Sequence, residues 1–296
     1  MKLLKYGLKD GELKYIDDVP NGLKCDCVCP NCSVKLVAHK GQKNVHHFKH
    51  YSLADCTYGQ ETALHMMAKS IIKNNRIVFV PNPPSSCYDD AIVGKCYRFQ
   101  NAYVEKQLSK EVRSDVLLEG GNHQLNVEIK VTHKVDDKKL IDLFNLNIST
   151  IEIDLSGMID VFDEKKVEDA IYNGKNTKLI YSNKKKGIYA KLILGDWKKI
   201  YQSGTRPYVK DCPFSHKKAS LMHSFWRYEL SGPNECHSCW GYDEWERYTK
   251  KYLCIGFFGK LDFSKIEKIL NVTKENGVIK YAELLVDGEV KRFGKP

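Results

Sequence analysis

The sequence lacks long hydrophobic runs. No stretch approaches the run of about 18 uncharged apolar residues that marks a membrane-spanning helix, which excludes such a span. The first residues, MKLLKYGLKD, lack the apolar segment of a secretory signal peptide. We therefore expect a cytoplasmic protein that has no membrane partner.

The sequence also lacks the composition of a disordered chain. Of its 296 residues 42% are hydrophobic and 28% are charged, so it has enough apolar surface to bury a core. Lys and Arg number 47 and Asp and Glu 37, a net charge of +10, and the span 174–210 holds ten basic residues but one acid. Such a stretch favours a polyanionic partner, although a solvated lysine-rich face has the same composition.

The eleven cysteines do not indicate a disulfide framework, because their number is odd and no secretory signal precedes them. Metal binding explains them better. Cys29 and Cys32 form a Cys-x2-Cys pair, which supplies two zinc ligands from one tight turn, and a second close pair follows an expected hairpin. We expect a closed structural zinc site whose ligands are Cys29, Cys32, His47 and His50. Nearby residues that could replace one of them are Cys25, Cys27, His46 and Cys56.

A second cysteine-rich segment lies near the C-terminus, among many aromatic residues. Its spacing resembles a zinc ribbon, with Cys-Pro, then Cys-x2-Cys before Trp-Gly, then a cysteine in an expected strand. The expected ligands of this second structural zinc are Cys212, Cys236, Cys239 and Cys254. His216, His223 and His237 are alternatives.

Hydrophobic periodicity predicts a mixed α/β core between these two segments, in the order α-β-β-β-α-β. The expected elements are a helix over 61–74, strands over 76–80, 112–118 and 125–132, a helix over 136–146, a strand over 150–155, a helix over 164–172 and a strand over 178–181. Near the C-terminus a helix is expected over 263–270. Asp-Gly pairs at 10–11 and 287–288 predict hairpin turns.

Two carboxylates and a lysine are expected to converge on this sheet. Asp115 lies in the expected strand 112–118, and Glu128 and Lys130 lie in the next one, 125–132. Glu128 and Lys130 are on the same face of their strand, because side chains alternate along a strand. Carboxylates bind Mg²⁺ or Mn²⁺, and the lysine can position water or stabilise a phosphoryl transition state. Glu61, in the first turn of the preceding helix, offers a further ligand. An exposed Glu-x-Lys pair on a strand is nevertheless common without any such role.

The order of the segments HHFKH, ETALHMMAK, RSDV, VEIKVTHKVDDKKL and STIEIDLS resembles the competence CoiA-like proteins of the PD-(D/E)XK nuclease superfamily, over about residues 1–160. By this resemblance Asp115 is the first acid of the motif, Glu128 and Lys130 are its (D/E)-x-K, and Glu61 is the glutamate of its first helix. His65, Lys69 and His133 fall in segments that also look like the family. The sequence departs from the pattern at Ser114, where the motif has proline.

We therefore expect three parts: an N-terminal hairpin and zinc-finger-like module (1–57), a PD-(D/E)XK nuclease domain (58–200) and a C-terminal zinc-ribbon-like domain (201–296). The resemblance implies a Mg²⁺- or Mn²⁺-dependent deoxyribonuclease in competence or phage defence, with DNA, or also RNA, as its partner and with its oligomeric state open. The alternative is a non-catalytic, zinc-containing nucleic-acid-binding protein.

Overall fold

The computed structural model describes residues 3–52, 56–83, 94–132, 135–203, 206–209, 242–246, 251–254, 258, 261–275 and 278–294. They form two compact units. One holds the described residues of Met1–Asn82, Ile92–Asp136 and Ser149–Ile180, and the other those of Pro83–Ala91, Asp137–Ile148 and Tyr181–Pro296. Within these ranges the structure has no helix that is both long enough and apolar enough to span a bilayer.

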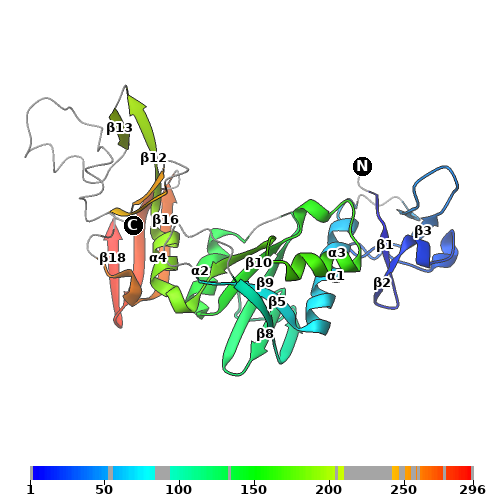
Figure 1. The fold of residues 1–296 in the computed structure, drawn as a ribbon, viewed down its shortest axis with the longest axis horizontal. Helices are drawn as coiled ribbons and strands as arrows, with labels where there is room; N and C mark the ends of the chain where they lie inside the picture. Colours follow the sequence, from blue (N-terminus) through cyan, green and yellow to red (C-terminus); the bar gives the residue numbers. More distant parts are fainter. Residues whose placement is uncertain are drawn as a thin grey trace, which may run out of the picture. The chain divides into compact units, whose positions relative to one another are not determined.

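A five-strand mixed sheet forms the centre of the first unit (Figure 1). Its strands are β7 (Asn101–Val104), β8 (Val116–Gly120), β9 (His123–Lys130), β10 (Ser149–Asp154) and β11 (Thr177–Tyr181), in the order β11-β10-β9-β8-β7. β7, β8 and β9 form an antiparallel meander, whereas β10 runs parallel to β9. The sheet confirms the expected mixed α/β class, whereas the expected strand at β5 (Ile77–Pro81) pairs with β6 (Gly94–Arg98) outside it.

Side-chain alternation along β9 divides its residues between an apolar row and a polar row. Val127 and Ile129 are buried in one core with Leu64 and other apolar residues of α1 (Gly59–Asn75), and α1 contacts β7, β8, β9 and α3 (Glu164–Tyr172). The other row of β9 carries Asn126, Glu128 and Lys130. The apolar residues whose spacing predicted the helix α1 and the strand β9 are therefore the residues that form this core.

The N-terminal strands belong to the same unit as the sheet. They are β1 (Tyr6–Lys9), β2 (Glu12–Tyr15), β3 (Leu36–His39) and β4 (His47–His50), and another hairpin is made by β5 (Ile77–Pro81) and β6 (Gly94–Arg98). Asp10 and Gly11 have φ of 52° and 80°, the positive values that a two-residue type I′ turn requires. The Tyr6 ring stacks on Phe162 at a centroid distance of 4.8 Å, and its hydroxyl donates to the Phe162 carbonyl at 3.1 Å.

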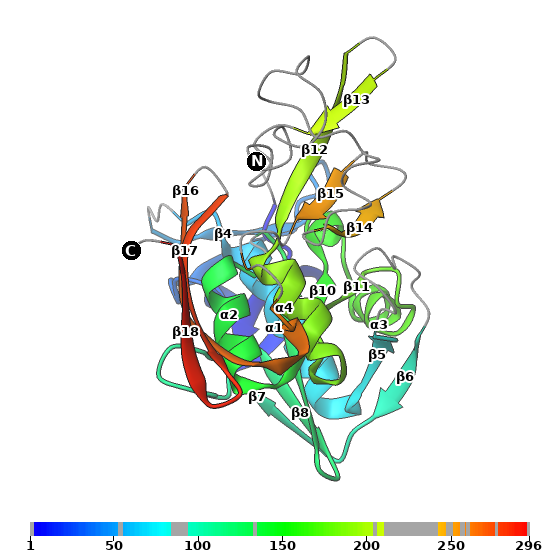
Figure 2. The ribbon, with the colours of Figure 1, turned by 90° about the vertical axis from the view of Figure 1, so that its left-hand side faces the viewer.

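In the second unit, α2 (Asp137–Leu146) packs against α4 (Lys186–Leu194) and β16 (Ile266–Glu275), as Figure 2 shows. β16 pairs with β17 (Val278–Val286), which pairs with β18 (Glu289–Gly294). A four-strand sheet has the order β13-β12-β15-β14, from β12 (Asp196–Ser203), β13 (Arg206–Val209), β14 (Tyr242–Glu246) and β15 (Lys251–Cys254).

The helix expected over 263–270 is wrong. A short 3-10 turn, Phe263–Lys265, leads into strand β16 there. The pairing of β16 with β17 shifts register between Ile266 and Lys268 and again between Ile269 and Asn271, and each shift adds one residue to β16. Because the first added residue lies between them, Ile266 and Ile269 are on the same side of the strand although they are three positions apart, and both are buried. That spacing imitates one face of a helix.

Candidate functional site

A tight turn between Cys29 and Cys32 builds the first part of a candidate metal site. The Ser33 amide donates to the Cys29 carbonyl at 3.0 Å, and Ser33 has the left-handed φ of 60° that lets the chain reverse. The backbone N–H groups of Asn31 and Cys32 also donate to the Cys29 thiol. Amides that point at a cysteine sulfur stabilise the thiolate, which is the form that binds a metal.

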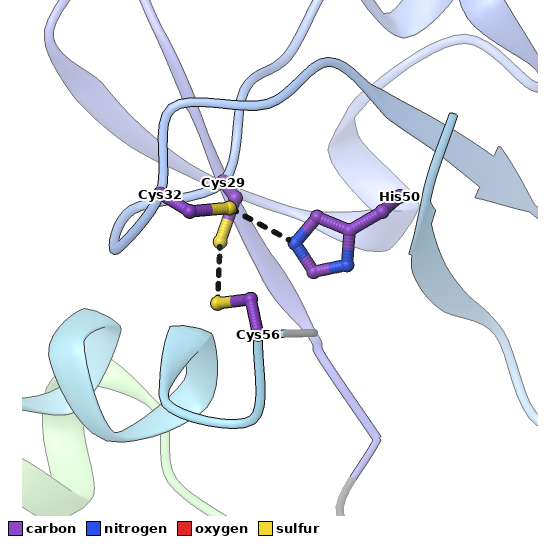
Figure 3. Close-up of side chains that lie close together, drawn as sticks. All are labelled: Cys29, Cys32, His50 and Cys56. Carbon is purple, nitrogen blue, oxygen red and sulfur yellow. Dashed lines mark hydrogen bonds between the residues drawn. The ribbon is translucent and has the colours of Figure 1, made fainter. Parts of the chain in front are cut away.

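Four side chains converge at this turn, from Cys29, Cys32, His50 and Cys56 (Figure 3). Their ligand atoms all lie within 4.8 Å of one another; Cys29 Sγ is 3.8 Å from Cys56 Sγ, and Cys32 Sγ is 3.4 Å from His50 Nε2. A disulfide needs a sulfur–sulfur distance of about 2.0 Å, whereas two sulfurs of a tetrahedral zinc site lie about 3.8 Å apart for Zn–S bonds of about 2.3 Å. The cluster is a candidate zinc site with three cysteines and one histidine.

Cys56 is set into the cluster by hydrogen bonds. Burial raises its pKa, but donors that include Asn31 Nδ2, at 3.4 Å, and the Tyr58 amide outweigh burial and lower the pKa. The Thr62 hydroxyl of α1 donates to Asn31 Oδ1 at 3.2 Å and so fixes the direction of that amide. Burial raises the pKa of Cys29 to about 12. A bound cation would compensate for this burial by stabilising the thiolate.

His47, which the spacing placed among the zinc ligands, is not in this cluster. It lies three residues from His50 in β4, and residues an odd number apart in a strand point to opposite faces. Its ring stacks on His39 at 5.3 Å, and Nδ1 is 2.8 Å from the Val45 carbonyl. The fourth residue of the cluster is Cys56, which was one of the four alternatives to the expected ligands. The signal for Cys56 in the sequence is that it lies three residues before α1 begins.

The second expected zinc site falls outside the part of the chain whose side chains are described. Cys212, Cys236 and Cys239 are not described, nor are the alternatives His216, His223 and His237. The backbone of Cys254 ends β15, the strand expected at that position. His133 likewise lies outside the described residues.

The Asp115 carboxylate is held by three donors. His65 Nε2 lies 3.0 Å and Lys69 Nζ 2.9 Å from its oxygens, and the Ile129 amide donates to Oδ2 at 2.9 Å. Lys69 also pairs with Glu105. Burial raises the pKa of Asp115, but its bonds to His65, Lys69 and Ile129 outweigh burial and hold that pKa well below its usual range. The carboxylate is therefore ionised at neutral pH.

Glu128, 5% exposed, accepts a hydrogen bond from Asn126 Nδ2 at 2.9 Å. Lys130 Nζ lies 2.5 Å from Asp154 Oδ2, and Asp154 is directly opposite Lys130 in the parallel pairing of β9 with β10. Glu61 Oε1 accepts from the Thr132 hydroxyl at 2.5 Å. Within the described ranges, the ligand atoms of Glu61, Asp115 and Glu128 do not form a compact metal-binding group.

Asp154, the partner of Lys130, was not among the expected site residues, and the roles of His65 and Lys69 had stayed open. Asp154 could not be paired with Lys130 without the strand register. His65 and Lys69 had a signal, since residues four apart lie on one helix face. The chain bends at Asp115 before β8 begins at Val116, and this bend brings the Asp115 carboxylate to that face.

Asp115→Asn is expected to lower the free energy of unfolding by about 1–3 kcal/mol at neutral pH, because an amide accepts these three bonds less well. The pKa of Asp115 is depressed in the folded state. Its contribution is therefore present above the pKa of the unfolded chain, about 3.9, and decreases as the pH falls below that value. Urea unfolding at pH 7 and at about pH 3, which is below the pKa of the unfolded chain, measures the difference. The exposed Asp160→Asn is the control, and an equal effect in both variants would contradict the prediction.

Comparison with known proteins gave no match among family models, curated proteins or solved structures.

Proposed function

We propose that the protein is a Mg²⁺- or Mn²⁺-dependent nuclease that hydrolyses phosphodiester bonds in DNA. The supporting observation is the 2.9 Å hydrogen bond from the Ile129 amide to Asp115 Oδ2, because Ile129 is the middle residue of the Glu-x-Lys segment. Asp115 directly precedes β8, and β8 pairs with β9, which carries Glu128 and Lys130.

Two carboxylates near the paired strands β8 and β9 offer oxygen donors to a hard divalent cation. Asp115 is ionised and partly accessible, with 18% of its side chain exposed, and Glu128 supplies a second carboxylate from the neighbouring strand. Mg²⁺ and Mn²⁺ prefer such oxygen ligands. Asp115 and Glu128 would hold the ion, which when bound would polarise a phosphoryl oxygen and acidify a water molecule.

Lys130 would stabilise the negative charge that develops on the phosphoryl oxygens in the transition state. Its ion pair with Asp154 favours the ammonium form, so an electrostatic role suits it better than that of a general base. Asp154 in turn accepts two bonds from Ser156, from the amide at 3.0 Å and from the hydroxyl at 2.6 Å. Asp154 is thereby fixed as a positioning residue for Lys130.

The decisive experiment incubates the full-length protein with plasmid, linear duplex and single-stranded DNA, each with Mg²⁺, with Mn²⁺ and without either ion. We expect cleavage that requires one of these ions. Absence of cleavage in all conditions, together with retained DNA binding, would make the non-catalytic, zinc-containing nucleic-acid-binding protein the better interpretation.

The basic span 174–210 should contribute to DNA affinity through its exposed lysines. Lys184 and Lys185 are exposed, whereas Lys186 donates to the Glu267 carbonyl at 2.7 Å and lies over the Phe144 ring. Reversing Lys184 and Lys185 to glutamate should reduce the slope of log K against log salt by about 1.4–1.8, because each phosphate contact contributes about 0.7–0.9.

Equilibrium binding at several salt concentrations tests this prediction. The exposed pair Lys268→Glu and Lys291→Glu in the same unit gives the same change of charge as a control. An unchanged slope in the Lys184 and Lys185 variant would show that these two side chains are only solvated surface.

A further inference from the structure

The hairpin of β3 and β4 presents one buried and one solvent-facing side. The register pairs Val37 with Lys49 and His39 with His47, and the Tyr51 amide donates to the Lys35 carbonyl at 2.8 Å. The intervening residues, Leu36, Ala38 and Phe48, are buried in the N-terminal core. The outward side of the hairpin, which we call the β3–β4 face, therefore consists of Lys35, Val37, His39, His47, Lys49 and Tyr51.

The β3–β4 face is strongly cationic. Between Cys27 and Ala54 the sequence has four lysines and four histidines but no acid. Lys35 and Lys49 are exposed, and neither forms an ion pair with any residue that the structure describes. The flanking carboxylate of Asp17 is already engaged by His46 Nδ1 at 2.5 Å. Lysines without neighbouring acids attract phosphates through their uncompensated charge.

Flat rings lie among these lysines. His39 and His47 stack with an interplanar angle of 13°, and Tyr51 is 64% exposed. Burial, and then the charges of Lys49 and His47, lower the pKa of His39, so its imidazole is neutral at neutral pH. A neutral ring with a free face stacks on a nucleic-acid base, whereas a cationic patch alone binds phosphates without such stacking.

We propose that the β3–β4 face binds single-stranded DNA, with phosphates on Lys35 and Lys49 and unpaired bases on Tyr51 and the histidine pair. A duplex stacks its bases on one another and shows only their edges in the grooves, so it cannot use the rings. A single strand can use both the charges and the rings. The inference extends the proposed nuclease function, since it gives that enzyme a place to hold an unpaired strand.

The test measures fluorescence anisotropy of a labelled oligothymidylate of about 20 nucleotides, long enough for a typical single-strand site, without added divalent metal. Tyr51→Ala should weaken binding about 5- to 150-fold, the range expected for the loss of one stacked base. Lys35→Glu with Lys49→Glu should also weaken binding and flatten its salt dependence. A matched duplex should lose much less affinity with Tyr51→Ala.

The control is Lys73→Glu with Lys165→Glu, which changes the charge equally at exposed helix positions of the same unit. The zinc content of each variant, measured alongside, shows whether the cluster of Cys29, Cys32, His50 and Cys56 is intact. Unchanged oligothymidylate binding in zinc-loaded Tyr51→Ala, or an equal loss for duplex and for single strand, would overturn the proposal. Because no cleavage is measured, failure of the nuclease function would leave this result unaffected.

Discussion

Glu128→Gln is expected to lower the rate of DNA cleavage about 10²–10⁴-fold, and Lys130→Met to do the same, while DNA affinity changes little. These groups act on charge that develops in the transition state, whereas binding in the ground state is distributed over many lysines. Glutamine keeps the bond that Glu128 accepts from Asn126, so the fold should survive the change. Single-turnover cleavage with saturating metal and protein measures the effect.

The matched control is Glu119→Gln. Glu119 lies on β8 near the β8–β9 turn, where it accepts a bond from Gln124 Nε2 at 2.9 Å, and it is not part of the proposed site. Wild-type rates in both the Glu128 and Lys130 variants would show that the active site lies elsewhere.

Asp115→Ala is a poorer test, because removing this carboxylate also takes away the partner of His65 and Lys69 and so affects stability.

Cys56→Ser and Cys29→Ser should each lose about one zinc per chain and destabilise the N-terminal strands, whereas His47→Ala should keep the ion. Structural zinc sites contribute folding free energy directly, with apparent binding free energies of about 10–16 kcal/mol in small modules. Cys29 is fully buried in a core with Leu36 and Phe48, so loss of the ion removes the centre of that core.

Elemental analysis of protein purified without a histidine tag gives the zinc content, and hydrogen exchange over residues 21–52 reports on the strands. The full-length protein is expected to contain two zinc ions, so the informative quantity is the loss relative to wild type. Loss of zinc in His47→Ala together with retention in Cys56→Ser would restore the ligand set expected from the spacing.

Local patterns predicted much of the fold. The alternation of Val127, Ile129 and Val131 predicted β9, and the Asp-Gly pairs predicted two hairpin turns, at 10–11 and at Asp287 and Gly288, whose φ are 51° and 78°. In contrast, the strand β16 has two bulges, and a bulge leaves no signal in a pattern that assumes a fixed period.

The candidate sites depended more on non-local geometry. Cys-x2-Cys fixed two zinc ligands because one turn holds both, but the choice between His47 and Cys56 depended on how the chain returns to that turn. For the carboxylates, the sequence placed Asp115 one strand from Glu128 but could not reveal the bend that turns Asp115 toward His65. Lys130 and Asp154 meet only through the parallel register of two strands.

The stacking of Tyr6 on Phe162 has a consequence for the design of shorter fragments. Tyr6 lies in the same buried core as Leu64 and Val127, and the Lys5 amide donates to Gln60 Oε1 of α1 at 2.9 Å. A fragment that begins at residue 58, where the sequence predicts a domain boundary, would lack Tyr6 and so expose the apolar side chains of α1 that pack in the same core. Such a fragment should aggregate when it is expressed, whereas one that begins before Leu4 should remain dispersed.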